Sequence, residues 1–264
     1  MLEGNLSSLY AVIFLQFGSM QLTISLCLIL WALCFMSYLI KSLTITGAIA
    51  AYFTALILVF GGLTNLILPL ILLIGGTFLT KLNKHASDKM GRNAKQVFAN
   101  GGIGLLCLIL YYFSGNALYY LAFLTSFAIS ISDTFSSEIG QYFKGKTFDI
   151  YSLNPMPSGL SGGISWIGTL GGLIGAMVCT LISFLFLNIQ LSDAFLVGAL
   201  GYAGMLLDSV LGSRLQAKYL DENNVLTEIN SEQLVKGYKW CTNDVVNLMA
   251  NAITVVVFIL SRSL

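Results

Sequence analysis

The stretch LYAVIFLQFGSMQLTISLCLILWALCFMSYLI, residues 9–40, contains no charged residue. A helix needs about 20 mainly apolar residues to cross a bilayer, because each residue rises about 1.5 Å through a hydrocarbon core roughly 30 Å thick. The stretch is too long for one upright helix, so we predict a short interfacial or tilted piece and then a span at 20–40. Backbone groups inside lipid must be paired within their own segment, which favours helices.

The rest of the chain repeats this pattern of long apolar segments between short polar ones. Of its 264 residues, 56% are hydrophobic and 9% are charged, whereas a soluble domain carries about 25% charged residues. We therefore predict an all-α, polytopic membrane bundle of about seven or eight transmembrane helices. It forms one membrane domain over residues 1–264, with 1–40 as an extra N-terminal helical segment. The further spans are expected at 43–61, 63–80, 97–113, 116–139, 161–189, 193–213 and 243–261.

The basic residues predict the orientation of these spans. If the spans alternate, almost all lysines and arginines fall on one side, and only Arg262 falls on the other. The residues on the shared side are Lys41, Lys81, Lys84, Lys89, Arg92, Lys95, Lys144, Lys146, Arg214, Lys218, Lys236 and Lys239. The positive-inside bias puts their loops in the cytoplasm and the protein in a cell (inner or plasma) membrane.

Composition also excludes several function classes. The net charge of +1 offers no basic face for nucleic acid. Five scattered cysteines and the single histidine, His85, lack the spacing of a zinc site.

Several ionisable and amide side chains enter the apolar segments near their cytoplasmic ends. Asp133 and Glu138 close one predicted span, and Asp208 lies near the end of another. Asn243, Asp244 and Asn247 open the last span, where Asn243, Asn247 and Asn251 share one helix face. A charge at the bilayer centre costs about 2.5–3.5 kcal/mol, so these groups indicate a functional site. The alternative reading is interhelical hydrogen bonding or capping.

The depth of these groups favours an enzyme over a transporter. A transporter site is expected near the bilayer midplane, whereas an enzyme that joins a soluble nucleotide to a lipid headgroup needs an interfacial site. Several facing carboxylates repel one another unless a cation is present. We therefore predict a Mg²⁺ ion held by Asp133 and Asp208 together with substrate phosphates, with Glu138 and Asp244 as further catalytic acids.

Other residues are candidates for binding phosphate. Ser161, Gly162 and Gly163 precede a predicted helix, and small residues let backbone N–H groups approach an anion. The alternative is an ordinary capped loop. In the basic loop and the span after it, Arg92, Lys95 and Asn100 can reach phosphates. On the last span, the amides of Asn243 and Asn247 can orient a substrate without adding charge.

Five segments in order resemble one membrane family. They are GRNAKQVFANGG (91–102), SDTFSSEIG (132–140), SGLSGGIS (158–165), DSVLGSRLQ (208–216) and TNDVVNL (242–248). The family was defined as a domain of unknown function. It includes transmembrane protein 19 and the phytyl-phosphate kinases of plants and cyanobacteria. The resemblance covers roughly residues 41–260.

This resemblance implies a kinase that transfers a phosphoryl group from CTP or another nucleoside triphosphate to an isoprenyl monophosphate. The implied partners are the triphosphate, the phytyl- or geranylgeranyl-type lipid phosphate and the bilayer, and the implied cofactor is Mg²⁺. Three rival functions stay open from the residues alone. One is a CTP-dependent lipid nucleotidyltransferase, and another is an ion-coupled transporter that uses Asp133 and Asp208 as cation sites. The third is a non-catalytic scaffold, in which alanine at the four acids would cost little beyond stability.

Overall fold

Long apolar helices make up most of the chain in the computed structural model, which describes residues 20–83, 91–221, 225–229 and 233–263. Within these ranges the helices are α2 (Met20–Leu39), α3 (Ile45–Val59), α4 (Ile67–Leu82), α5 (Ala94–Ser114), α6 (Ala117–Phe143), α7 (Trp166–Phe186), α8 (Leu191–Leu215) and α9 (Asn243–Ser263), with a 3-10 turn η1 (Leu63–Leu66) before α4. Seven helical segments of this part are long and apolar enough to cross a membrane, and α3 is shorter, with 15 residues. The predicted all-α membrane protein is confirmed.

The helix boundaries follow the prediction closely except around α7. This helix begins at Trp166 rather than near residue 161, because the Ser165 side chain caps it by accepting from the Gly168 N–H. The preceding residues belong to strand β2 (Gly163–Ile164), which pairs antiparallel with β1 (Phe148–Asp149). The expected interfacial piece before residue 20, and the basic residues Lys84 and Lys89, lie outside the described residues.

The chain divides into two compact units. The first comprises Met1–Ile67 and Met90–Val97, and the second comprises Leu68–Lys89 and Phe98–Leu264. In the first unit, α2 packs against α3. The segment before α3 pairs with the segment before α5, because Thr44 N–H donates to the Arg92 carbonyl at 3.0 Å and Arg92 N–H donates to the Ser42 carbonyl at 2.9 Å.

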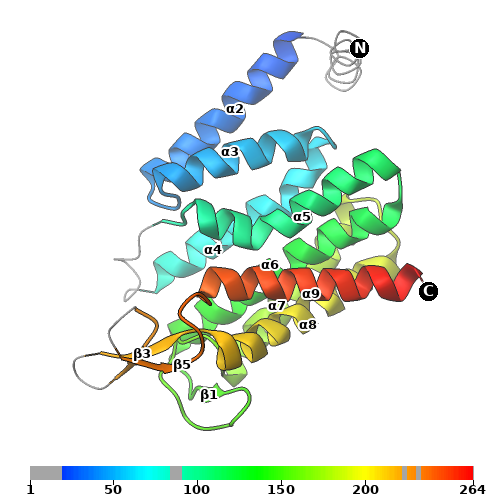
Figure 1. The fold of residues 1–264 in the computed structure, drawn as a ribbon. Helices are drawn as coiled ribbons and strands as arrows, with labels where there is room; N and C mark the ends of the chain where they lie inside the picture. Colours follow the sequence, from blue (N-terminus) through cyan, green and yellow to red (C-terminus); the bar gives the residue numbers. More distant parts are fainter. Residues whose placement is uncertain (1–19, 84–90, 222–224, 230–232, 264) are drawn as a thin grey trace. The chain divides into compact units, whose positions relative to one another are not determined.

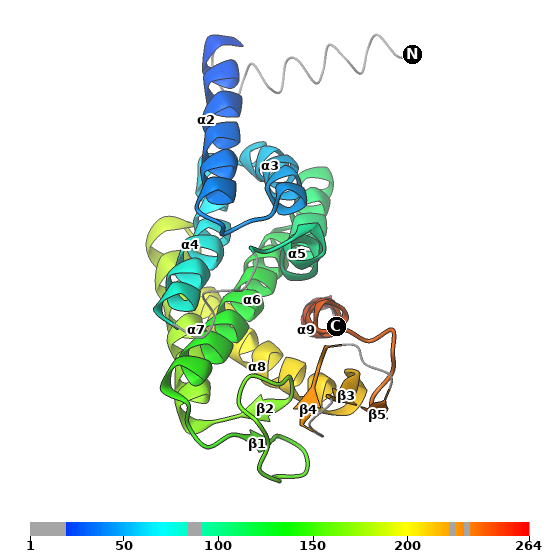
Figure 2. The ribbon, with the colours of Figure 1, turned by 90° about the vertical axis from the view of Figure 1, so that its left-hand side faces the viewer.

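In the second unit, α6 packs against α7, α8 and α9 (Figures 1 and 2). Small residues allow this close approach. A Cβ atom added at Gly175 of α7 would lie 2.9 Å from Ser132 Cα of α6, and one at Gly201 of α8 would lie 2.7 Å from Ala128 Cβ of α6. The helix that carries Asp133 is therefore fixed by backbone contacts on two sides.

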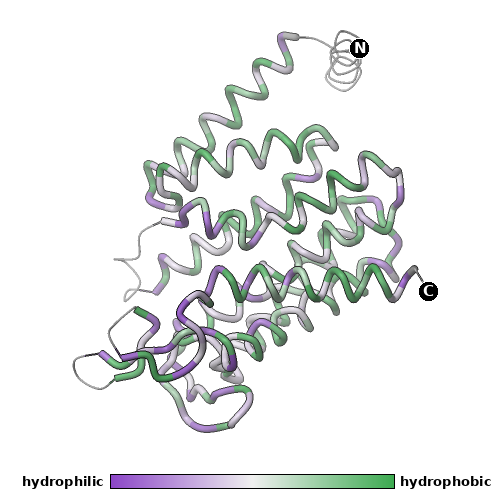
Figure 3. Tube along the Cα trace, in the orientation of Figure 1, coloured by the Kyte–Doolittle hydropathy of each residue, from purple (hydrophilic) through white to green (hydrophobic). Residues whose placement is uncertain are grey.

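Short strands gather at the end of the second unit where α8 ends and α9 begins (Figures 1 and 2). Strand β3 (Lys218–Leu220) lies between β4 (Leu226–Thr227) and β5 (Leu234–Lys236) in an antiparallel sheet. Hydrophilic residues concentrate at this end, whereas the helices are mostly hydrophobic (Figure 3). The sequence predicts only loops here, so the sheet is a feature that the structure adds.

Candidate functional site

Asp208 and Asn247 form the centre of a polar cluster among apolar helices. Asp208 lies near the C-terminal end of α8 and is 6% exposed, and Asn247 lies near the N-terminal end of α9 and is 7% exposed. The Asn247 amide is oriented with its nitrogen toward two acceptors. Its nitrogen then donates to Asp208 Oδ2 at 2.9 Å and to the Asn243 carbonyl at 3.2 Å. The sequence predicts both residues as site residues, and the structure brings them together.

A hydrogen-bonded ladder continues from Asn247 into the core. The side chains of Asn100 and Asn247 approach to 3.2 Å. Ser130 of α6 donates to the Asn100 carbonyl at 2.7 Å. Asn251 accepts from Ser126 at 2.8 Å and donates to Ser130 at 3.4 Å. The ladder joins α5, α6 and α9, so Asn251 serves the interhelical role that the sequence allows as an alternative.

Two further carboxylates act on Asp208 through their charges. One is Asp133 on α6, which the sequence predicts, and the other is Glu228 in the loop after β4. Among the described residues, no three or more histidine, cysteine, aspartate or glutamate side chains form a group that could hold a metal ion. A cation at Asp133 and Asp208 therefore needs further ligands from a substrate, which is how Mg²⁺ is usually bound beside phosphates.

Glu138 lies on a different side of α6. Its Oε1 accepts from the Thr80 hydroxyl of α4 at 2.7 Å, and its Oε2 is buried without a hydrogen-bond partner. The reason is helix geometry, because residues five apart on a straight helix point in quite different directions. No contact of the described residues joins Glu138 to the cluster around Asp208.

Two backbone N–H groups of the predicted phosphate loop already have protein acceptors in this structure. Ser161 N–H donates to Glu228 Oε1 at 2.5 Å, and Gly163 N–H donates to the Leu160 carbonyl at 3.1 Å. The Glu228 carboxylate thus accepts from the Ser161 N–H, where the sequence predicts a phosphate oxygen. Sequence reasoning could not find this contact, because 67 positions separate its two residues.

Gly162 fixes the same loop against α8. Its φ of +80° belongs to the left-handed region, and an added Cβ would lie 2.4 Å from the Ser213 nitrogen. Gly162 therefore permits close packing onto the helix that carries Asp208, whatever role its N–H group has.

Asp149 fastens this loop region to α8 and β5, and it is a residue that the sequence does not single out. It accepts from the N–H groups of Ser152 at 2.9 Å and Tyr151 at 3.1 Å, from the Ser213 hydroxyl at 2.8 Å and from Lys236 Nζ at 3.3 Å. Burial alone raises the pKa of Asp149, but these hydrogen bonds and the Lys236 charge outweigh it and hold the pKa below its ordinary value.

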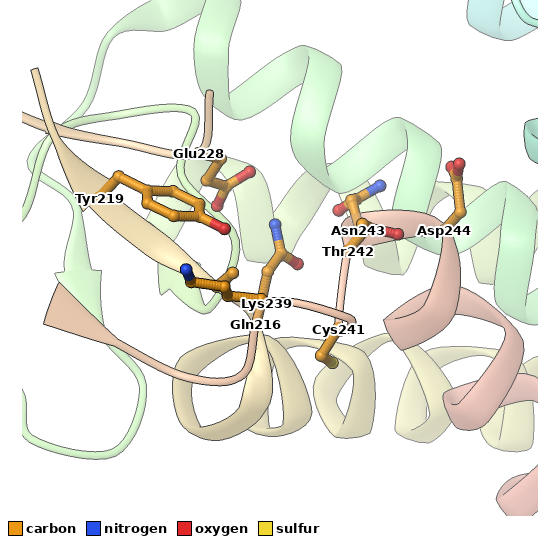
Figure 4. Close-up of a pocket in the computed structure, with 9 residues that line it drawn as sticks. Gln216, Tyr219, Glu228, Lys239, Cys241, Thr242, Asn243 and Asp244 are labelled. Carbon is orange, nitrogen blue, oxygen red and sulfur yellow. The ribbon is translucent and has the colours of Figure 1, made fainter. Parts of the chain in front are cut away.

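A cavity of about 450 Å³ opens beside the cluster, between the sheet and the start of α9. It is lined by Gln216, Ala217, Tyr219, Glu228, Lys239, Cys241, Thr242, Asn243 and Asp244. Figure 4 shows the side chains of Gln216 and Glu228 near its middle, with the Tyr219 ring to one side and Asn243 and Asp244 toward the other. The predicted residues Asn243 and Asp244 thus line one wall, and the rest of the lining comes from the loop after α8.

Two charged groups near the cavity, Lys218 and Glu228, have pKa values that burial shifts. Lys218, on β3, is 1% exposed, and burial together with the charge of Lys236 lowers its pKa, although Glu228 and Asp149 act in the opposite direction. Burial raises the pKa of Glu228, and the Ser161 N–H, Lys218 and Gln216 partly offset this effect. The one sequence signal for this region is the length of the loop between α8 and α9, since long loops are often functional.

Arg92 and Lys95 belong to the first unit. Arg92 precedes α5 and pairs through its backbone with residues 42–44, and Lys95 is exposed in the first turn of α5. Their predicted contact with phosphate stays a prediction.

Comparison with known proteins gives a consistent result. The family model described as integral membrane protein DUF92 matches residues 28–255. The uncharacterised membrane protein MJ0933 of Methanocaldococcus jannaschii is 33% identical over 220 residues, which cover 79% of this chain and 91% of that protein. Protein VTE6, chloroplastic, of Arabidopsis thaliana is 27% identical over 200 residues, which cover 71% of this chain and 55% of that protein. No solved structure matches the chain.

Proposed function

Since the chain belongs to the DUF92 family of integral membrane proteins, we propose that it is a membrane-embedded isoprenyl-monophosphate kinase. A phosphate oxygen of the lipid forms a bond to the γ-phosphorus of a nucleoside triphosphate, with CTP favoured. The bond from that phosphorus to the bridging oxygen breaks, and the nucleoside diphosphate leaves. The products are the isoprenyl diphosphate and, from CTP, CDP. The reaction class comes from the resemblance to phytyl-phosphate kinases.

The observation that carries this proposal is the pairing of two acids with a polar cavity at one end of the helices. Asp133 and Asp208 stand on neighbouring helices α6 and α8 and interact through their charges. The cavity beside them is lined by loop residues and by Asn243 and Asp244 at the start of α9. This arrangement lets a soluble triphosphate enter from water while an isoprenyl tail stays in lipid.

The oxygen ligands of the cluster suit Mg²⁺. Carboxylates such as Asp133 and Asp208 are its usual protein ligands, and substrate phosphates complete the shell. The ion would neutralise charge that develops on the transferred phosphoryl group. The protein residues position the reactants: Asn247 and Asn100 donate or accept beside Asp208, and Asn243 lies at the mouth of the cavity.

A strong general base is unnecessary in this mechanism. The attacking lipid phosphate is already an anion, so positioning and charge stabilisation supply most of the acceleration. By the positive-inside bias, the site opens to the cytoplasm of a cell membrane.

The test uses the purified protein in lipid with Mg²⁺, CTP and geranylgeranyl or phytyl monophosphate, with the products identified by mass. Isoprenyl diphosphate with CDP is the expected result. Release of CMP and pyrophosphate would instead establish nucleotidyl transfer. If all four triphosphates stay intact with several lipid phosphates, the kinase is rejected, and ion or solute flux into proteoliposomes without nucleotide becomes the next measurement.

Substitution of the acids tests the site itself. We expect Asp133→Asn and Asp208→Asn each to lower kcat by a factor on the order of 10² or more, because each removes charge stabilisation of the transition state. Asp193→Asn is the matched control on α8, where Asp193 makes a 3.8 Å ion pair with Arg262 at the far end of the helix. Wild-type turnover in both cluster variants would refute the assignment.

A further inference from the structure

Gln216 lines the cavity and carries an unpaired acceptor. The residue is 2% exposed, and its Oε1 is buried without a hydrogen-bond partner. Its other amide atom is used, because the Gln216 side chain makes a hydrogen bond to Glu228. A buried acceptor without a partner lowers the stability of the folded protein. Native structures rarely keep such a group without a reason, and Gln216 also lines the cavity.

The wall around this acceptor is suited to a planar ring with N–H donors. Glu228 adds carboxylate oxygens next to the Gln216 amide, and Tyr219, a residue that is 4% exposed, places an aromatic ring in the same lining. Aromatic side chains stack on nucleobases of any kind. Acceptor groups of Glu and Gln select bases through their amino groups. Figure 4 shows Tyr219 and Glu228 on the side of the cavity away from Asp244, with Gln216 between them and Asn243.

We propose that this cavity is the nucleoside site, in which Gln216 Oε1 and Glu228 recognise the exocyclic amino group of the donor nucleotide. The inference rests on the proposed kinase function and assigns the base-selecting residues of its donor. The opposite wall then faces the phosphates. It is formed by Asn243 and Asp244 in the first turn of α9, whose N–H groups favour an anion. The Asn247 amide nitrogen connects this wall to the acid, because it donates to the Asn243 carbonyl and to Asp208 Oδ2.

Binding of CTP and UTP isolates the amino group, because the two pyrimidines differ at that position, where UTP has a carbonyl. The binding of each triphosphate is measured with Mg²⁺ on the full chain in nanodiscs, without lipid phosphate. We expect CTP to bind about tenfold or more tightly than UTP, because the UTP carbonyl cannot donate a hydrogen bond to the Gln216 acceptor.

Gln216→Met tests the acceptor with little change of volume. We expect it to weaken CTP binding about tenfold while UTP binding changes less than about twofold, so that the preference disappears. A merely structural role of Gln216 would weaken both nucleotides equally. Gln233→Met is the matched control, because Gln233 is exposed and lies in the same loop outside the cavity lining.

The outcomes separate this inference from the proposed function. A CTP preference that Gln216→Met abolishes supports the nucleoside site even if no lipid phosphate is turned over. An unchanged preference in that variant overturns the site even if the wild type forms isoprenyl diphosphate. Absence of binding by both nucleotides, or equal binding by both, also overturns it.

Discussion

Single polar side chains in the apolar helices divide into two groups with different roles. Asn251 and the serines of α6 bond one another, so their effect is to hold α6 against α9. The charges of Asp208 and Asp133 oppose each other, so this pair does not itself stabilise the fold, and it belongs to the proposed metal site. Interhelical hydrogen bonds in membranes contribute about 0.6 kcal/mol on average, which makes the first group a modest stabiliser.

Asn251→Ala tests the structural group. It removes the acceptor of the Ser126 hydroxyl and one donor to Ser130. We expect unfolding in detergent to be easier by about 1–2 kcal/mol, because two bonds are lost and a buried hydroxyl is left unpaired. Val256→Ala, at a 52% exposed position of the same helix, is the control and should change stability little. Equal effects of the two substitutions would contradict the role of Asn251.

Asp149 predicts a pH dependence of stability. Its pKa is lower in the folded protein than the ordinary value of about 3.9. A depressed pKa stabilises the fold above the unfolded value, and this contribution is lost as pH falls through the folded value. We therefore expect Asp149→Asn to destabilise the protein by about 1–3 kcal/mol at neutral pH. The difference from wild type should shrink below about pH 4.

The measurement is the free energy of unfolding in detergent, for the wild type and for Asp149→Asn, between neutral and acidic pH. Ser213→Ala removes one of the donors that lower this pKa, so it should move the loss of stability to higher pH than in wild type. If the stability difference between the wild type and Asp149→Asn stays constant across this pH range, the stabilising role of the Asp149 carboxylate is refuted.

Helices are held in register by glycine where α7 meets α6. Gly171 and Gly175 of α7 lie against α6, where added Cβ atoms would come within 2.9 Å of the Phe135 oxygen and of Ser132 Cα. Ser132 immediately precedes Asp133, so this helix contact also positions the acid. Glycine costs helix propensity, and the close approach explains why it is kept.

Gly175→Ala should therefore destabilise the protein by about 1–3 kcal/mol, because backbone atoms must move apart to admit the methyl group. The turnover rate of this variant should fall together with its stability. Gly102→Ala on α5 is the matched control, because the nearest atom to its added Cβ is 3.9 Å away. This control should be neutral or stabilise by up to about 1 kcal/mol through helix propensity. The check is thermal unfolding in one detergent, and a tolerated Gly175→Ala would refute the argument.

The path of the whole chain across the membrane follows from a contact in the first unit. Residues 42–44 precede α3 and pair with Arg92, which follows α4. The chain between residue 44 and Arg92 must therefore return to the membrane surface from which it started. Helices α3 and α4 therefore make an even number of crossings, although α3 is short. This places Lys41 and Arg92 on one side, as the positive-inside bias predicts.

Accessibility of single cysteines tests this topology in a background whose native cysteines are replaced by alanine. Ser158→Cys and Ile229→Cys are at exposed loop positions beside the site. Ser114→Cys is at an exposed position at the C-terminal end of α5. An impermeant maleimide should label the first two only from the cytoplasmic face and Ser114→Cys only from the opposite face. Labelling of Ser158→Cys and Ile229→Cys from different faces would refute the arrangement of the site.

The sequence by itself determined the membrane class and the helix positions, and it singled out Asp208 and Asn247 as candidate site residues. It could do so because a polar group in lipid is costly, so apolar length and each interrupting acid or amide carry a strong signal. Only the tertiary structure decided three other features. Glu138 accepts a hydrogen bond from the Thr80 hydroxyl, and Glu228 accepts one from the Ser161 N–H. Gln216 lines a cavity. These residues lie in water-facing loops or at helix ends, where polar side chains are the rule and long-range packing alone determines their partners.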